Sequence, residues 1–141
     1  MTPAGTAPAD PLANAQVLVV EDEFLIATAV EDMLREAGVQ KVISVLNFED
    51  AQVALARDPP VDLAVFDIKL DRSQEAGLVL AEIALKRAIP FIFATGYNSD
   101  VTLPERFAGI PVVSKPYIPK DLIDTLHAVL GQNRRTPFSP V

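Results

Sequence analysis

The chain contains no cysteine, and only one of its 141 residues is a histidine. Without cysteine there can be no disulfide framework, no thiolate metal site and no cysteine nucleophile, and the cytoplasm is the expected compartment. The single histidine, His127, falls in an expected helix that is remote in sequence from every other candidate residue. We therefore interpret it as an ordinary helix residue and not as a phosphohistidine.

Positive charge is also scarce, because 12 lysines and arginines stand against 19 aspartates and glutamates, for a formal net charge of −7. Phosphate contacts supply most of the affinity for nucleic acid, so this chain is not expected to bind it. No apolar stretch reaches the length of about 18–20 residues that a membrane-spanning helix requires. Residues 1–15 lack the basic start and apolar core of a secretory signal. No membrane association is expected.

What the chain does have is enough apolar material for one core, since half of its residues are hydrophobic. We expect a disordered leader over residues 1–14, one folded domain over 15–131 and a flexible tail over 132–141. Both ends are too short for a DNA-binding or catalytic unit. The domain is therefore expected to act through contacts with other proteins.

Strand-like and helix-like segments alternate along this domain. Short apolar runs predict strands at residues 16–21, 42–46, 63–67, 91–95 and 112–114. Apolar residues at helical spacing predict helices at 24–37, at 75–87, from the N-cap Asn47 to the prolines at 59 and 60, and from Pro119 to 130.

The segment between the last two strands is the weakest helix candidate. Residues 96–111 hold two prolines and two glycines, so we expect at most a short turn at 104–107. The resulting fold class is α/β, a (βα)5 doubly wound parallel five-stranded sheet with a degraded fourth helix. Right-handed crossovers would place helices on both faces of the sheet.

Four of the expected strands end at residues that can carry chemistry. Their ends are Glu21-Asp22-Glu23, Asp67, Thr95-Gly96 and Lys115-Pro116. The carboxyl ends of parallel strands lie along one edge of the sheet, which is where open α/β sheets bind ligands. The sequence therefore predicts one site that gathers carboxylates, a hydroxyl and an ammonium group.

Such a set of carboxylates suits a hard divalent cation such as Mg²⁺, which prefers oxygen ligands and keeps several waters. We expect Asp22 and Asp67 to bind the metal directly, Glu21 to bind it through water and the backbone carbonyl of Lys69 to join them. Glu23 is expected to leave the pocket. The alternative is that the acidic triplet only caps the following helix, where carboxylates are favourable.

Asp67 is the candidate nucleophile, because a carboxylate can accept a phosphoryl group and form an acyl phosphate. Lys115 would neutralise charge on the transferred oxygens, and Pro116 suggests a fixed bend that a cis bond could form. Thr95 offers a hydroxyl, and Gly96 lets the backbone approach closely. Each residue also has an ordinary interpretation: a turn aspartate, a surface lysine or a strand-end threonine.

These ordered strand ends resemble the receiver domain of two-component response regulators over roughly residues 15–131. The resemblance implies that Glu21 and Asp22 bind Mg²⁺ and that Asp67 is the phosphoacceptor. Thr95 and the pair Lys115-Pro116 match the family's remaining site positions. It further implies a flavodoxin/CheY-like fold and a module of a phosphorelay that is not an enzyme, beyond self-phosphorylation or dephosphorylation. The expected donor is a histidine kinase or a histidine phosphotransfer protein.

The stretch from Pro90 to Tyr97 is similar to the signature of the FAT GUY subgroup of single-domain receivers. The segments 103–107 and 114–117 agree with that subgroup, which is associated with the stress response and with HWE-type kinases. One position departs from the wider family, because Val112 replaces the usual aromatic residue three positions before the lysine. We hypothesise that Tyr97 reports the phosphorylation state instead.

Three other functions were weighed. A haloacid-dehalogenase phosphatase needs a second aspartate where this chain has Lys69, and an FMN carrier needs a hydroxyl-rich loop where it has Glu21-Asp22-Glu23. The third is an interaction or scaffold module that works without phosphorylation. The sequence does not exclude that third alternative.

Overall fold

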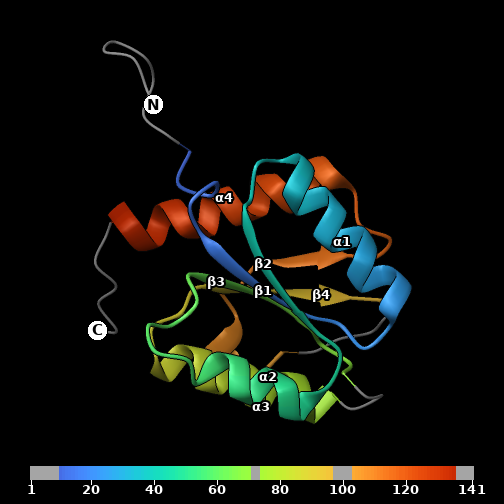
Figure 1. Ribbon diagram of the computed structural model, residues 1–141. Coiled ribbons are helices and arrows are strands. Elements are labelled where there is room, and N and C mark those ends of the chain that lie inside the picture. Colours follow the sequence, from blue (N-terminus) through green and yellow to red (C-terminus); the bar gives the residue numbers. More distant parts are fainter. Residues whose placement is uncertain (1–9, 71–73, 97–102, 136–141) are drawn as a thin grey trace, which may run out of the picture.

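The computed structural model describes residues 10–70, 74–96 and 103–135. They form one five-stranded parallel sheet in the order β2-β1-β3-β4-β5, with helices on both faces (Figure 1). The strands are β1 (Gln16–Val20), β2 (Lys41–Val45), β3 (Leu63–Asp67), β4 (Phe91–Thr95) and β5 (Val112–Ser114). The helices are α1 (Phe24–Glu36), α2 (Phe48–Leu55), α3 (Gln74–Lys86), the 3₁₀ helix η1 (Glu105–Phe107) and α4 (Pro119–Arg135). This strand order is that of the flavodoxin/CheY-like fold, which confirms the predicted class.

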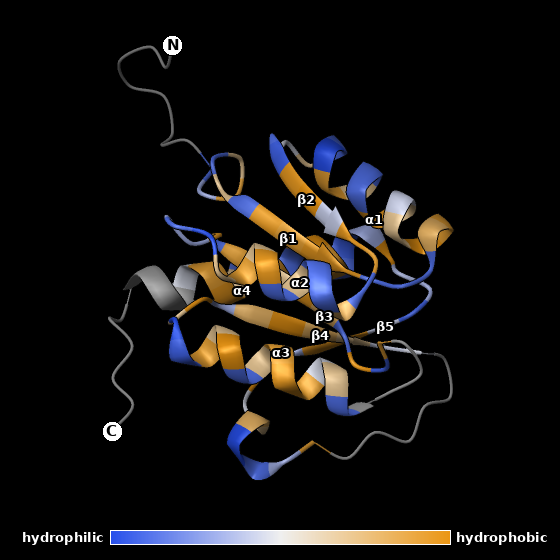
Figure 2. Ribbon diagram, turned by 60° about the horizontal axis from the view of Figure 1, so that its bottom comes forward, coloured by the Kyte–Doolittle hydropathy of each residue, from blue (hydrophilic) through white to orange (hydrophobic). Residues whose placement is uncertain are grey.

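The central strands are apolar along their whole length because the sheet is covered on both faces. In β3, Leu63 and Val65 face the layer of α1 and α4, whereas Ala64 and Phe66 face the layer of α2 and α3. Figure 2 shows the same pattern, with apolar strands between helices whose polar residues lie on the outside. All five residues of β3 are buried, so Asp67 is carried into the interior by its strand.

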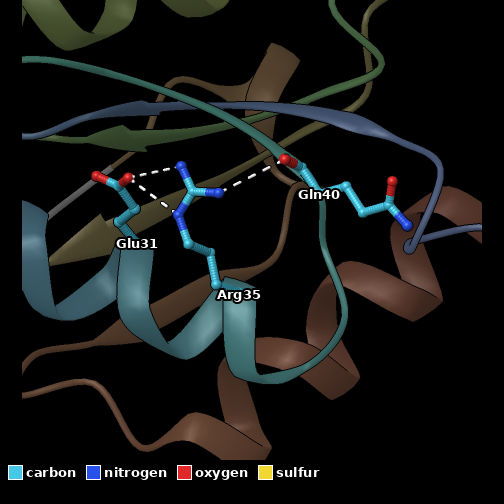
Figure 3. A network of polar contacts seen from close by, with 3 residues as sticks. All are labelled: Glu31, Arg35 and Gln40. Atoms are coloured by element: carbon cyan, nitrogen blue, oxygen red, sulfur yellow. Dashed lines mark hydrogen bonds and ion pairs between the residues drawn. The ribbon is translucent and has the colours of Figure 1, made fainter.

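The predicted element bounds agree closely with the structure. The bounds predicted for β3, β4 and β5 are confirmed, and those of β1, β2, α1 and α3 differ by one residue at one or both ends. Helix α2 ends at Leu55, so the prediction that the prolines at 59 and 60 end it is wrong. Asn47 is the N-cap of α2, and its side chain accepts a hydrogen bond from the backbone N–H of Asp50 at 2.8 Å. At the other side of the sheet, Arg35 of α1 contacts Glu31 at 2.8 Å and the carbonyl of Gln40, which lies just before β2 (Figure 3).

The fourth crossover has a 3₁₀ turn, η1, as the composition of residues 96–111 predicted. Phe107 at the end of η1 is fully buried and contacts Phe93 edge to face at 5.7 Å between ring centroids. It makes a similar contact with Phe91 at 6.2 Å. Phe107 is the buried anchor of this part of the crossover, and Leu103 and Ile110 on either side of η1 pack against the same core cluster. Residues 97–102 lie outside the described part of the chain.

The predicted leader and tail boundaries are both wrong by a few residues. Residues 10–14 are not a disordered leader, because Leu12 is fully buried against the layer of α1 and α4. Asp10 accepts a hydrogen bond from the N–H of Leu12 at 2.9 Å and contacts His127 of α4 at 3.0 Å. At the other end, α4 continues to Arg135, since the chain meets its next proline only at position 137.

The contact with Asp10 agrees with the interpretation of His127 as an ordinary helix residue. Among the described residues, no helix combines the length and the apolar character needed to cross a membrane.

Candidate functional site

The carboxyl ends of β1, β3 and β5 bring together the three charged residues at the centre of the candidate site. Lys115 follows β5, and its Nζ lies 2.7 Å from Oε1 of Glu21 and 3.1 Å from Oδ2 of Asp67. Glu21 directly follows β1, and Asp67 is the last residue of β3, which pairs with β1. The parallel topology therefore produces the cluster that the strand ends predicted.

The acidic part of the site consists of Glu21, Asp22 and Asp67. One carboxylate oxygen from each of these residues lies within 4.8 Å of the others. Glu21 is fully buried and Asp67 is 4% exposed, whereas Asp22 is half-buried. Three carboxylates at this separation are a donor set that fits Mg²⁺ or a similar hard cation. Glu23 is exposed, as expected for a residue that leaves the pocket.

Backbone amides hold two of the carboxylates in place. The N–H of Lys69 donates to Oδ1 of Asp67 at 3.2 Å, and the N–H of Glu23 donates to Oε2 of Glu21 at 3.2 Å. Each acidic side chain therefore uses one oxygen for an amide and the other for Lys115. Lys69 contributes its amide to the carboxylate of Asp67, and the predicted role of its carbonyl as a metal ligand stays a prediction.

Negative charge exceeds positive charge inside this pocket. Burial raises the pKa of Glu21 to about 7, and the charge of Asp67 adds to that effect, while Lys115 opposes it. Burial also raises the pKa of Asp67 against the opposing effect of Lys115. Burial lowers the pKa of Lys115, but its hydrogen bond to Glu21 and the two negative charges outweigh burial, so its pKa is raised. A further cation in the pocket would stabilise the charged carboxylates.

Thr95 ends β4, which lies between β3 and β5. Its hydroxyl is buried and has no hydrogen-bond partner among the described residues, although its carbonyl accepts from the N–H of Lys115 at 2.8 Å. The hydroxyl is thus available to a ligand oxygen. Gly96 follows it directly, and the Lys115–Pro116 bond is cis, one of the forms that the predicted bend allowed.

Tyr97, the hypothesised reporter, lies outside the described residues. Val112 is 43% exposed at the edge strand β5. Sequence reasoning gave no role to Tyr117, a partly buried residue two positions after Lys115. Burial raises the pKa of its phenol, and the charges of Glu21 and Asp67 raise it further. Its position directly after Lys115-Pro116 was the available signal.

Comparisons with known proteins agree with this fold. No family model matches the chain. It is 32% identical over 131 residues to the transcriptional regulatory protein PdtaR of Mycobacterium tuberculosis, covering 92% of this chain and 63% of PdtaR. The chain thus spans less than two thirds of that relative.

Solved structures extend the comparison. SdrG of Sphingomonas melonis Fr1 is 37% identical, with a TM-score of 0.70 over 84% of this chain and 98% of SdrG. A BeF₃-activated conformation of SdrG matches with a TM-score of 0.68 at 35% identity. The PhyR stress response regulator is 26% identical, with a TM-score of 0.68 over 90% of this chain and 49% of PhyR. A signal receiver domain from Vibrio parahaemolyticus, at 21% identity and a TM-score of 0.71, shares the fold.

A parallel sheet of this order, with an acidic cluster and a lysine at its carboxyl edge, defines a doubly wound α/β protein whose polar groups lie at the edge where such sheets bind ligands. The chain belongs to the receiver domain family of the response regulators of two-component signalling.

Proposed function

We propose that Asp67 is the phosphoacceptor of this receiver domain. The observation that supports the proposal is the surrounding of its carboxylate, with Lys115 at 3.1 Å, the Lys69 amide at 3.2 Å and two further carboxylates in the same cluster. The Asp67 carboxylate thus lies beside a cation and within a donor set that fits a metal. The buried Thr95 hydroxyl would donate to an oxygen of the transferred group.

The step is a nucleophilic transfer. A carboxylate oxygen of Asp67 attacks the phosphorus of a phosphohistidine, an O–P bond forms, the P–N bond breaks, and the released imidazole nitrogen takes up a proton from solvent. Lys115 and the backbone of Gly96 would face the transferred oxygens. Mg²⁺, held by Asp22 and Asp67 with Glu21 through water and the Lys69 carbonyl, would supply positive charge for those oxygens.

The partner that fits this chemistry is a histidine kinase or a histidine phosphotransfer protein. Membership of the FAT GUY subgroup would make an HWE-type kinase the donor and the stress response the pathway. The similarity to the PhyR stress response regulator supports the stress response as the pathway. The acidic net charge favours protein contacts over nucleic acid as the route of output, and we place the domain in the cytoplasm.

The proposal is tested by incubating the protein with Mg²⁺ and acetyl phosphate and measuring the intact mass. One added phosphoryl group is expected, and it should be absent when Mg²⁺ is chelated. In the host cell, Asp67→Ala should abolish signalling. Unchanged signalling by that variant would favour the scaffold function that needs no phosphorylation.

The read-out of phosphorylation is a separate proposal, in which Tyr97 replaces the aromatic residue absent at Val112. NMR of the Tyr97 ring should show a change of environment when beryllofluoride is added together with Mg²⁺. A ring whose signals do not move would contradict this role.

A further inference from the structure

Helix α3 packs its backbone directly against the chain that follows the acceptor. A Cβ placed on Gly77, in the first turns of α3, would lie 2.6 Å from the carbonyl oxygen of Ile68 and 2.8 Å from that of Asp67. Real Cβ atoms essentially never approach other atoms within 3.0 Å, and both neighbours here are backbone. Any side chain at position 77 must therefore push α3 and this segment apart.

The same two peptide groups are held on their opposite sides by hydrogen bonds. The N–H of Ile68 donates to the carbonyl of Ala94 in β4 at 2.9 Å, and the N–H of Lys69 donates to Oδ1 of Asp67 at 3.2 Å. A peptide group is planar, so displacement of a carbonyl displaces the N–H of the same group. Displacement of the Ile68 carbonyl therefore also displaces the Lys69 N–H, which donates to the Asp67 carboxylate.

Neither side of this contact has room to yield. Ile68 and Leu70 are both fully buried, which fixes the segment after Asp67 in the core. Helix α3 is fixed by its own buried residues, Leu80, Ala81 and Ala84. The closest approach of α3 to the acceptor segment is therefore set at Gly77.

We infer that Gly77 is a positioning residue for phosphoryl transfer, which sets the peptide between Ile68 and Lys69 so that its N–H orients the Asp67 carboxylate. This inference rests on the proposed function of Asp67. The atoms nearest to a Cβ at Gly77 are backbone atoms of Asp67 and Ile68 and not a carboxylate. Because Gly77 has no side chain, the backbone of α3 can pack directly against the backbone of Asp67 and Ile68.

The test compares Gly77→Ala with Gly131→Ala. Both replace a helical glycine, and alanine favours the helix more than glycine does. A Cβ at Gly131 has no described atom within 4 Å, so this variant is the control for helix propensity. Phosphorylation by acetyl phosphate in Mg²⁺ is measured by intact mass at a temperature at which circular dichroism shows all proteins folded.

We expect the phosphorylation rate of Gly77→Ala to fall roughly ten- to hundredfold, the effect of displacing a reacting group by a fraction of an ångström to an ångström. The amide signal of Lys69 should shift in its NMR spectrum, which a purely structural loss of stability would not produce in the folded protein. Gly131→Ala should react as the wild type does. A Gly77→Ala rate within twofold of the wild type would overturn the inference.

Two outcomes separate this inference from the function on which it rests. Failure of the wild-type protein to accept a phosphoryl group would contradict the role of Asp67 itself. If Gly77→Ala does not fold, the wild type is titrated with beryllofluoride in Mg²⁺. The amide signals of Gly77 and Lys69 should then move together, and a Gly77 signal that stays fixed while Lys69 moves would overturn the positioning role.

Discussion

Removing the Lys115 ammonium gives the sharpest test of how the site is balanced. Lys115→Met keeps most of the side-chain volume but leaves Glu21 and Asp67 as buried carboxylates without their cation. Breaking a buried ion pair in this way costs about 3–5 kcal/mol, or roughly 10–20 °C in the melting temperature of a domain of this size. That loss is expected at pH 8 in the absence of Mg²⁺.

The loss should depend strongly on pH. A carboxylate whose pKa is higher in the folded than in the unfolded protein stabilises the fold below its unfolded pKa and loses that contribution as pH rises through its folded pKa. For Glu21, that window already runs from 4.5 to about 7 in the wild type. Without Lys115 the pKa of both carboxylates rises further. At pH 5 Glu21 is then largely protonated, and the variant should lose about half as much stability or less.

Thermal unfolding of the metal-free protein at pH 5 and pH 8 measures both values. Lys120→Met is the matched control, because Lys120 is exposed and pairs with Asp124 on the surface of α4. Its melting temperature should stay close to that of the wild type at both pH values. Equal losses for Lys115→Met at pH 5 and pH 8 would refute the argument that uncompensated buried charge is the cause.

Three further predictions concern the metal and the fold. Burial raises the pKa of Glu21 to about 7, so the affinity for Mg²⁺ should fall about tenfold between pH 8 and pH 6. A Mg²⁺ titration at each pH measures this change, and a constant affinity would mean that Glu21 does not take part in metal binding. Phe107→Ala should lower the free energy of unfolding by about 3–5 kcal/mol in urea denaturation, because the ring is fully buried. Val53→Ala, at an exposed position, should change it little. A loss below about 1 kcal/mol for Phe107→Ala would show that η1 is not fixed by this ring. Asn47→Ala should cost about 1 kcal/mol in the same assay through loss of the N-cap of α2, and Asn47→Asp, which keeps a capping oxygen, should not.

The sequence was most informative where local pattern and topology agree. Strand β3 is an unbroken apolar run that ends at Asp67. Its bounds could be predicted because a strand that is covered on both faces is apolar at every position. Parallel topology then places Glu21, Asp67 and Lys115 at one edge, so the site followed from the strand ends alone. Local turn chemistry likewise identified the N-cap at Asn47.

The features that were missed depend on contacts between distant segments. Leu12 stands in a stretch rich in proline and alanine, and only the surface offered by α1 and α4 makes it a core residue. From the sequence alone, Gly77 is only an unfavourable residue in a helix. The reason for a glycine is the nearby carbonyl of Ile68, which leaves no room for a side chain. Tyr117 packs against the core layer of α1 and α4, a contact that the fold of the β5–α4 connection provides. No periodicity or propensity encodes these distances.

The most direct measurement of the central claim is to locate the phosphoryl group by peptide mass spectrometry. The wild type, Asp67→Asn and the exposed control Asp32→Asn are each incubated with acetyl phosphate and Mg²⁺. We predict a phosphoryl group on Asp67 in the wild type and in Asp32→Asn, and none in Asp67→Asn. An unmodified wild type, or a phosphoryl group on another residue, would contradict the account.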